Sequence, residues 1–171
     1  CWQTKFSILE FLIEHPFLNH PSIYLYNEDV FKFDFRKLAE TLDQSNILVL
    51  GNPPWVTNSE LSVLNSANLP AKSKFKSHNG IEAITGKGNF DIGEYIILMM
   101  LDFFAHRVGS LAMLTKDSVI KNVLWDLLKT NYPICNLTAL KFDAKLHFNA
   151  SVDASLFRCD FGQQQDELVC N

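Results

Sequence analysis

The segment "NILVLGNPPWV", residues 46–56, contains the features on which the fold depends. Its first part, "NILVLG", is a continuous apolar run, which is typical of a strand buried on both faces of a parallel sheet. Asn52, Pro53, Pro54 and Trp55 follow at once. Each proline fixes φ and lacks an N–H donor, so this turn has little conformational freedom. Two interpretations are open: a plain stop signal for the strand, or a rigid turn that presents functional groups.

Helix and strand patterns alternate on both sides of this turn. Apolar residues at helical spacing predict a helix over 3–14, and the alternating segment 22–26 predicts a strand. Asp34 fits the N-cap of a short helix over 34–42. Further along, the patterns predict a helix over 91–106, a strand over 109–115, a helix over 117–130, and strands over 134–140 and 152–161. This order indicates an α/β sheet with right-handed crossovers. The absence of a helical pattern between the last two strands indicates a terminal antiparallel pair.

A long polar segment separates the turn from the next helix. Residues 57–89 are rich in Ser, Asn and Gly, and they contain Lys72, Lys74, Lys76 and Lys87. Long segments without periodicity inside a domain tend to be functional or mobile. These lysines have two interpretations: side chains of a solvated loop, or contacts to DNA phosphates that order the loop. Lys116, near the end of a predicted strand, is expected on the surface.

The composition is that of a globular domain without a broadly basic surface. Of 171 residues, 47% are hydrophobic and 20% are charged, and the formal net charge is −4. This charge argues against a general nucleic-acid-binding coat but allows a local basic patch. The longest apolar run, residues 95–104, is interrupted by Asp102 and is too short to span a bilayer. We therefore expect a buried helix there and no membrane association.

The positions of the cysteines and histidines do not predict a metal site. The four cysteines are far apart, none forms a CxxC pair, and the five histidines are scattered, so no metal-ligand spacing is visible. Cysteines in apolar stretches are the ordinary core thiols of a reducing cytoplasm, and we expect a cytoplasmic protein. The first residues show no secretory signal. Because there is no initiator Met, we expect the chain to begin inside a longer protein.

The turn and the order of elements resemble the adenine-specific DNA methyltransferases of bacterial restriction–modification systems, which use S-adenosylmethionine. The mark of this family is Asn, Asp or Ser, then Pro-Pro and an aromatic residue, at the end of the fourth strand; residues 52–55 match it. The segments "IYLYNEDVF", "GNFDIGEYIILMMLDFF", "GSLAMLTKDSVIKN" and "FDAKLHFNASVDASLFRCDF" resemble other family elements. The resemblance implies a Rossmann-like class I methyltransferase sheet over residues 1–162, including the long loop 57–89, and a polar tail over 163–171.

The sequence departs from the family in its cofactor motifs. The family binds the methionine part of the cofactor at a Gly-rich turn after the first strand, whereas the sole Gly-x-Gly here, residues 86–88, follows no strand. We therefore expect the first two strands to be missing, so that this chain is the C-terminal portion of a catalytic domain and is inactive alone. By resemblance, Asp29 would hold the adenine of the cofactor and Phe148 would stack on the target base. A solvated turn acid and a packed aromatic ring are the respective alternatives.

The residue types at 52–55 suit the transfer of a methyl group to an aromatic amine. The exocyclic nitrogen of adenine is a poor nucleophile because its lone pair is drawn into the ring. The side-chain oxygen of Asn52 and the carbonyl of Pro53 would accept the amino hydrogens and free that lone pair, with Pro54 as a rigid spacer. Trp55 would offer a stacking face, and the base would have to rotate out of duplex DNA. This chemistry requires neither a metal nor a strong general base.

Three alternatives remain open at this point. Related turns also serve enzymes that act on RNA adenine or on a protein glutamine. The long lysine-bearing loop suits DNA, and a glutamine enzyme would more often have Tyr at position 55. The third alternative is a non-catalytic relic of the fold that binds DNA or protein. The expected partners are double-stranded DNA and a restriction or specificity subunit or domain.

Overall fold

The chain consists of two separately defined units. The computed structural model describes residues 2–16, 22–42, 46–57, 91–163 and 169–171. One unit is Cys1–Phe33 and the other is Asp34–Asn171. The predicted long loop therefore lies almost entirely outside the described residues.

The first unit contains one helix and an irregular segment. The helix α1 (Trp2–Glu14) confirms the helix expected over 3–14, and none of its residues is buried. The strand expected over 22–26 is wrong, since these residues form no ladder and Tyr24 is 76% exposed. A strand needs backbone partners on a neighbouring strand, and alternation in the sequence cannot supply them. A turn at Asp29 follows, in which the backbone N–H groups of Lys32 and Phe33 donate to the Asp29 carbonyl.

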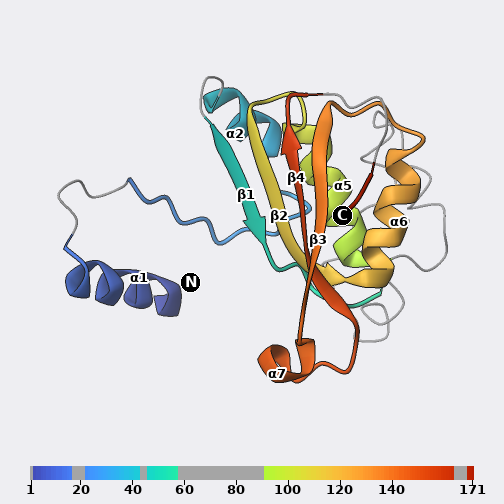
Figure 1. Ribbon diagram of the computed structural model, residues 1–171. Coiled ribbons are helices and arrows are strands. Elements are labelled where there is room, and N and C mark those ends of the chain that lie inside the picture. The colour runs from blue at the N-terminus through green and yellow to red at the C-terminus, as the bar shows by residue number, and fades with distance from the viewer. Residues whose placement is uncertain (1, 17–21, 43–45, 58–90, 164–168) are drawn as a thin grey trace. The chain divides into compact units, whose positions relative to one another are not determined.

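The second unit is built on a four-stranded mixed sheet (Figure 1). Its strands are β1 (Ile47–Gly51), β2 (Gly109–Lys116), β3 (Ile134–Phe142) and β4 (Ala154–Phe161), in the spatial order β1-β2-β4-β3. Strands β1 and β2 are parallel, whereas β4 runs antiparallel to both β2 and β3. The four predicted strands of this unit and the terminal antiparallel pair are thus confirmed.

Three of the four described helices of the second unit begin at a side-chain cap. The four are α2 (Phe35–Thr41), α5 (Ile92–Phe104), α6 (Asp117–Leu127) and α7 (Ala144–Phe148), and α6 is the exception. Asp34 caps α2 by accepting from the Lys37 N–H, as expected, and Asp91 caps α5 in the same manner through Gly93. The helix α7 was not predicted; it lies between β3 and β4 and is capped by Asp143. A single helical turn is too short to produce a periodic apolar pattern.

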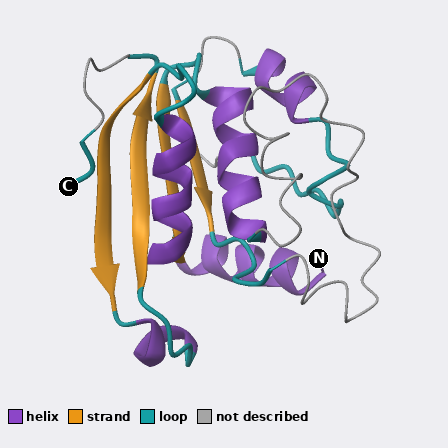
Figure 2. Cartoon of the chain, turned by 90° about the vertical axis from the view of Figure 1, so that its right-hand side faces the viewer, coloured by secondary structure: helices purple, strands orange, loops and turns teal. Residues whose placement is uncertain are grey.

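The core lies between the sheet and the helices α5 and α6, which cover the same face (Figure 2). In α5, Tyr95, Ile97 and Leu101 are fully buried, and on the sheet Leu111 and Phe157 are fully buried. This confirms that the apolar run 95–104 is a core helix. No helix in the described part of the chain is long and apolar enough to cross a bilayer.

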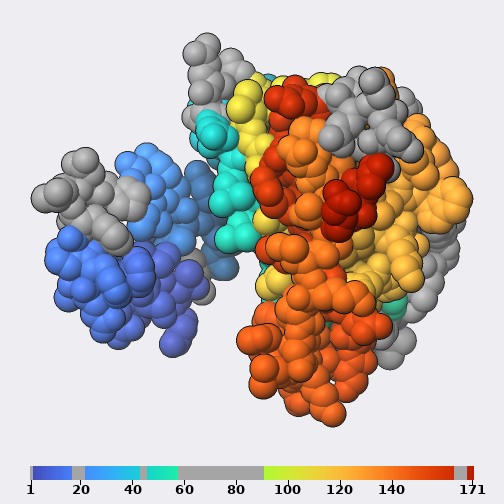
Figure 3. Space-filling model, in the orientation of Figure 1, coloured from blue at the N-terminus to red at the C-terminus, as the bar shows by residue number. Residues whose placement is uncertain are grey.

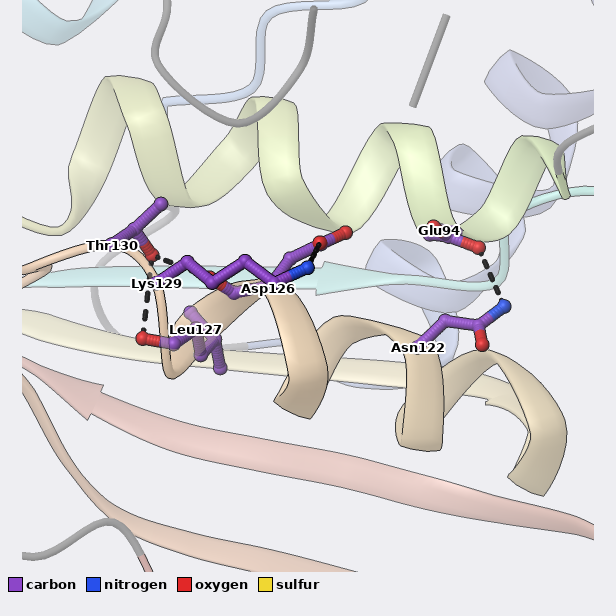
Figure 4. Close-up of polar contacts among 6 residues, drawn as sticks. All are labelled: Glu94, Asn122, Asp126, Leu127, Lys129 and Thr130. Atoms are coloured by element: carbon purple, nitrogen blue, oxygen red, sulfur yellow. Dashed lines mark hydrogen bonds and ion pairs between the residues drawn. The ribbon is translucent and has the colours of Figure 1, made fainter. Parts of the chain in front are cut away.

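Polar contacts join α5 to α6 inside this layer (Figure 4). Asn122 donates to a carboxylate oxygen of Glu94 over 2.8 Å, and Glu94 is buried. At the far end of α6, Lys129 pairs with the buried Asp126 over 3.5 Å. Hydrogen bonding to a buried carboxylate limits the cost of removing it from water.

Among the described residues of the second unit, no helix lies on the opposite face of the sheet (Figures 1 and 2). The expectation that the 46–51 strand is buried on both faces is therefore wrong. In β1, Ile47 is buried but Leu48 and Leu50 are 65% and 71% exposed. Figure 3 shows this face, with atoms of the strands at the surface and the β3–β4 tip protruding at the lower end. An all-apolar strand indicates covered faces only when covering elements are present.

Candidate active site

The Asn52–Trp55 turn begins where β1 ends. Gly51, the last residue of β1, pairs with Met113 in β2. A Cβ on Gly51 would lie 2.7 Å from the Met113 sulfur, so the strand approaches this side chain closely. Pro53 is buried, whereas Asn52 and Pro54 are exposed. The turn is therefore anchored by its first proline and presents Asn52 at the surface.

One pocket of about 300 Å³ lies in front of this turn. It is lined by Asn52, Pro53, Pro54, Trp55, Phe148 and Ala150. Among the described residues, no hydrogen bond occupies the Asn52 carboxamide. The pocket thus combines a free amide, a rigid backbone and two aromatic rings.

Trp55 is positioned by a hydrogen bond from its indole N–H and by two aromatic neighbours. Its ring is half-buried, and Nε1 donates to the Leu114 carbonyl over 3.2 Å. The ring centroids of Trp55 and Phe148 are 5.5 Å apart at an interplanar angle of 63°, and Phe142 lies 6.3 Å from Trp55. Because the edge of one ring meets the face of the other, a flat ligand between Trp55 and Phe148 requires one ring to rotate.

Phe148 reaches the pocket from the tip of the β3–β4 hairpin. It is the last residue of α7 and is 46% exposed. The Leu146 N–H donates to Asp143 over 2.9 Å at the start of α7, and Asn149 ends the helix with φ of 53°. Asparagine tolerates the left-handed conformation better than most residues, so the local sequence favours this tight return of the chain. The position of Phe148 next to the turn therefore depends on the caps Asp143 and Asn149 at the two ends of α7.

A second cavity of about 410 Å³ lies on the same hairpin. Lys141, Lys145, Asp143 and Asp153 are among its lining residues, so it carries charges of both signs. It includes no residue of the 52–55 turn. The smaller pocket is therefore the better candidate for recognising a flat polar ring.

Two charged residues behind the turn were missed by the sequence analysis. Lys116, at the end of β2, forms an ion pair with Asp91, and their side chains are 17% and 10% exposed. The expectation that Lys116 is a plain surface residue is thus wrong. Asp91 directly precedes an apolar helix, a pattern that identifies N-caps, so its role as a cap could be predicted from the sequence. Its pairing with Lys116 could not be predicted in this way.

Asp29 lies in the first unit and is engaged in its own turn. Its Oδ1 accepts from the Phe31 N–H over 3.0 Å, and its Oδ2 pairs with Lys32 over 3.1 Å. Burial alone would raise the pKa of Asp29, but the hydrogen bond from Phe31 and the pairing with Lys32 lower it below the usual value. The carboxylate is therefore ionised and positioned by local contacts.

The four lysines predicted to contact DNA are Lys72, Lys74, Lys76 and Lys87, and all of them lie outside the described residues.

The described residues contain no candidate metal site. In the described ranges, no group of His, Cys, Asp and Glu side chains could hold a metal ion. The described thiols of Cys135, Cys159 and Cys170 are free, and the first two are buried. Burial raises the pKa of the Cys159 thiol to about 12, which suits a core residue.

Comparison with known proteins points to one class, the type II methyltransferases. No family model matches the chain. The chain is similar to the Type II methyltransferase M.NspV of Nostoc sp. (strain ATCC 29411 / PCC 7524), with 34% identity over 155 residues. The matched region is 91% of this chain but only 32% of that relative, so the chain spans about a third of its length. A match of this length includes the turn at residues 52–55 wherever in the chain it begins.

Proposed function

We propose that this chain is the acceptor-binding part of a DNA methyltransferase that methylates the exocyclic amino group of adenine. The observation that carries the proposal is the pocket formed by the 52–55 turn and Phe148. Its oxygens and rings suit a planar heterocycle with an amino group. The similarity to a type II methyltransferase supports methyl transfer as the reaction class.

The chain's own groups would act by holding the amine in place. The side-chain oxygen of Asn52 and the carbonyl of Pro53 would each accept one amino hydrogen, which favours a tetrahedral nitrogen with an available lone pair. The prolines restrict the backbone, so these acceptors need little reorganisation during the reaction. After methyl transfer the nitrogen releases a proton to solvent. Trp55 and Phe148 would hold the ring by stacking, which is worth roughly 1–3 kcal/mol per base.

S-adenosylmethionine would supply the methyl group. Among the described residues, Asp29 is the single candidate that we assign to its binding. The Asp29 carboxylate is already engaged by the Phe31 N–H and by Lys32 within its own turn. The Lys32 partner of Asp29 is 69% exposed, and exposed ion pairs contribute little, so a ligand can replace it. We propose Asp29 as a cofactor contact and assign no reaction step to it. The parallel pair β1–β2, the antiparallel β4 and the helices on one face are compatible with a Rossmann-like methyltransferase sheet.

The test of the proposal is methyl transfer by the complete protein and by its Asn52→Ala variant. Labelled S-adenosylmethionine is offered with duplex DNA, and the digested product is examined for N6-methyladenine. We expect the variant to lose methylation by at least about 100-fold, because it loses one of two acceptors. Cofactor binding and the melting temperature should stay within error of the wild type, since the Asn52 side chain is exposed.

The same assay separates the alternatives. RNA and a glutamine-containing peptide are offered as competing substrates under identical conditions. Label in either one, and none in DNA, would replace adenine in DNA as the substrate. Intact cofactor binding without any transfer would favour the non-catalytic relic. An Asn52→Asp variant, which keeps acceptor oxygens at this position, should retain more activity than Asn52→Ala.

A further inference from the structure

Three elements of the second unit meet directly behind the 52–55 turn. The exit of the turn is tied to the start of α5, because the Ile92 N–H donates to the Val56 carbonyl over 3.0 Å and Thr57 forms a bridge with Asp91. The end of β2 lies against the same point. A Cβ added to Gly93 would lie 3.3 Å from the Thr115 hydroxyl and 3.7 Å from Pro53. The turn, α5 and β2 therefore leave no space between them.

The Asp91–Lys116 ion pair closes this junction. Each carboxylate oxygen of Asp91 has a separate partner: Oδ1 accepts from the Gly93 N–H over 2.9 Å, and Oδ2 pairs with Lys116. The carboxylate thus links the start of α5 to the end of β2 through one side chain. Trp55 also contacts β2, because its indole N–H donates to the Leu114 carbonyl.

We propose that Asp91 and Lys116 are positioning residues that hold the 52–55 turn in its productive geometry. This inference rests on the proposed function for its consequence in catalysis, but the contact itself is independent of it. Thr57 lies two residues after Trp55 and is bridged to Asp91, so a displacement of Asp91 would move the backbone that leads out of the turn. An error of about 1 Å in the position of a reacting group can reduce a rate about 100-fold.

The burial of the pair explains why both charges are needed. The two side chains are mostly removed from water, and removing one partner of such a pair leaves an uncompensated charge. A Lys116→Met variant leaves the Asp91 side chain without its cationic partner at the start of α5. Water or another cation would then have to enter the junction, and the start of α5 would lose its side-chain link to β2.

The experiment compares Lys116→Met with Lys129→Met in the complete protein. Lys129 is the control for loss of the charge alone, because it also pairs with a buried aspartate but its own side chain is 67% exposed and lies at the far end of α6. Single-turnover methyl transfer, the KM for DNA, and the ¹⁹F spectrum of 5-fluorotryptophan-labelled protein are measured. The Trp55 resonance is assigned from its loss in a Trp55→Phe variant. Lys116→Arg serves as the rescue variant.

We expect Lys116→Met to slow methyl transfer at least tenfold, to leave the KM for DNA within about twofold, and to shift the Trp55 resonance. Lys116→Arg should recover most of the rate, and Lys129→Met should match the wild type. Equal rates and an unmoved Trp55 resonance in Lys116→Met would overturn the inference. If the wild type transfers no methyl groups but the Trp55 resonance still shifts, the positioning contact stands and the proposed function fails.

If Lys116→Met does not fold, the ion pair is removed by substituting Asp91 instead. Asp91→Asn keeps an oxygen that can cap α5 while it removes the ion pair. The double variant Asp91→Asn/Lys116→Met removes both charges. If the pair acts as one unit, the double variant should transfer methyl groups no more slowly than the slower single variant. Losses that multiply would overturn the inference.

Discussion

Trp55 combines two contacts that use different parts of its side chain. The indole N–H donates to the Leu114 carbonyl, and the ring faces Phe148 and the pocket. The N–H bond sets the ring orientation, while the ring face is what a base would meet. A substitution that keeps a ring but removes the donor can therefore separate anchoring from stacking.

We expect Trp55→Ala to weaken binding of substrate DNA about 5- to 150-fold, which corresponds to the roughly 1–3 kcal/mol of one stacking contact. Trp55→Phe should lose less, because it keeps an aromatic face. Equilibrium titration of the complete protein with DNA checks both values at one salt concentration. Equal affinity of Trp55→Ala and wild type would mean that the indole only packs against its neighbours.

Asp160 is the most heavily hydrogen-bonded carboxylate on the uncovered sheet face. It accepts from Ser110 over 2.7 Å, from Asn136 over 2.9 Å and from Arg158 over 2.8 Å. The hydrogen bond from Ser110, then that from Asn136, lowers the pKa of Asp160. Its contribution to stability is therefore complete above the unfolded-state pKa of about 3.9 and is lost as the pH falls through the folded-state pKa.

We expect Asp160→Asn to lower the free energy of unfolding at pH 7 by about 1–3 kcal/mol, the usual effect of removing a charged hydrogen-bond partner. As the pH falls below the unfolded-state pKa of about 3.9 and through the folded-state pKa, the difference between wild type and variant should shrink, because the wild-type carboxylate becomes protonated. Urea unfolding at a series of pH values checks this. A difference that stays constant down to pH 2 would contradict the assigned cause.

At the scale of elements, the junction of β1 and β2 depends on one glycine. Gly109 begins β2 opposite Ile47 with φ of 151°, and a Cβ there would lie 1.9 Å from the Ile47 carbonyl oxygen. No side chain can be accommodated without moving β1. Since β1 ends at the 52–55 turn, a shift of β1 would also move the candidate site.

We expect Gly109→Ala to destabilise the protein by roughly 2–4 kcal/mol, from backbone strain together with the clash. Gly51→Ala is the control from the other end of the same strand pair. Its Cβ would meet the flexible Met113 thioether at 2.7 Å, which can move, so its loss should be smaller. Urea midpoints of both variants test the order, and a larger loss for Gly51→Ala would contradict it.

The short helix α7 shows how an unpredicted element completes the site. Phe148 could be proposed from the sequence as a hairpin aromatic, but its distance from Trp55 depends on the return of the chain through Asn149. That return follows from local caps of a single turn, which leave no periodic signal. The identity of the ring was predictable, whereas its placement against the turn was not.

At the largest scale, the second unit is a sheet whose described helices α5 and α6 cover one face only. Leu48 and Leu50 are exposed on the other face, although their sequence is that of a fully buried strand. An apolar run indicates that a strand is stable when both of its faces are covered. It does not indicate which segment covers them. The two units of the chain likewise have boundaries that composition alone did not reveal.

The sequence by itself determined the order of the four sheet strands and of the helices α1, α2, α5 and α6, and the rigid turn at residues 52–55. These depend on periodicity, capping and proline geometry, which act within a few residues. Only the tertiary structure decided that Lys116 is paired behind the turn and that Phe148 meets Trp55. The physical reason is that each of these is a contact between segments far apart in the chain, and such contacts leave no local pattern.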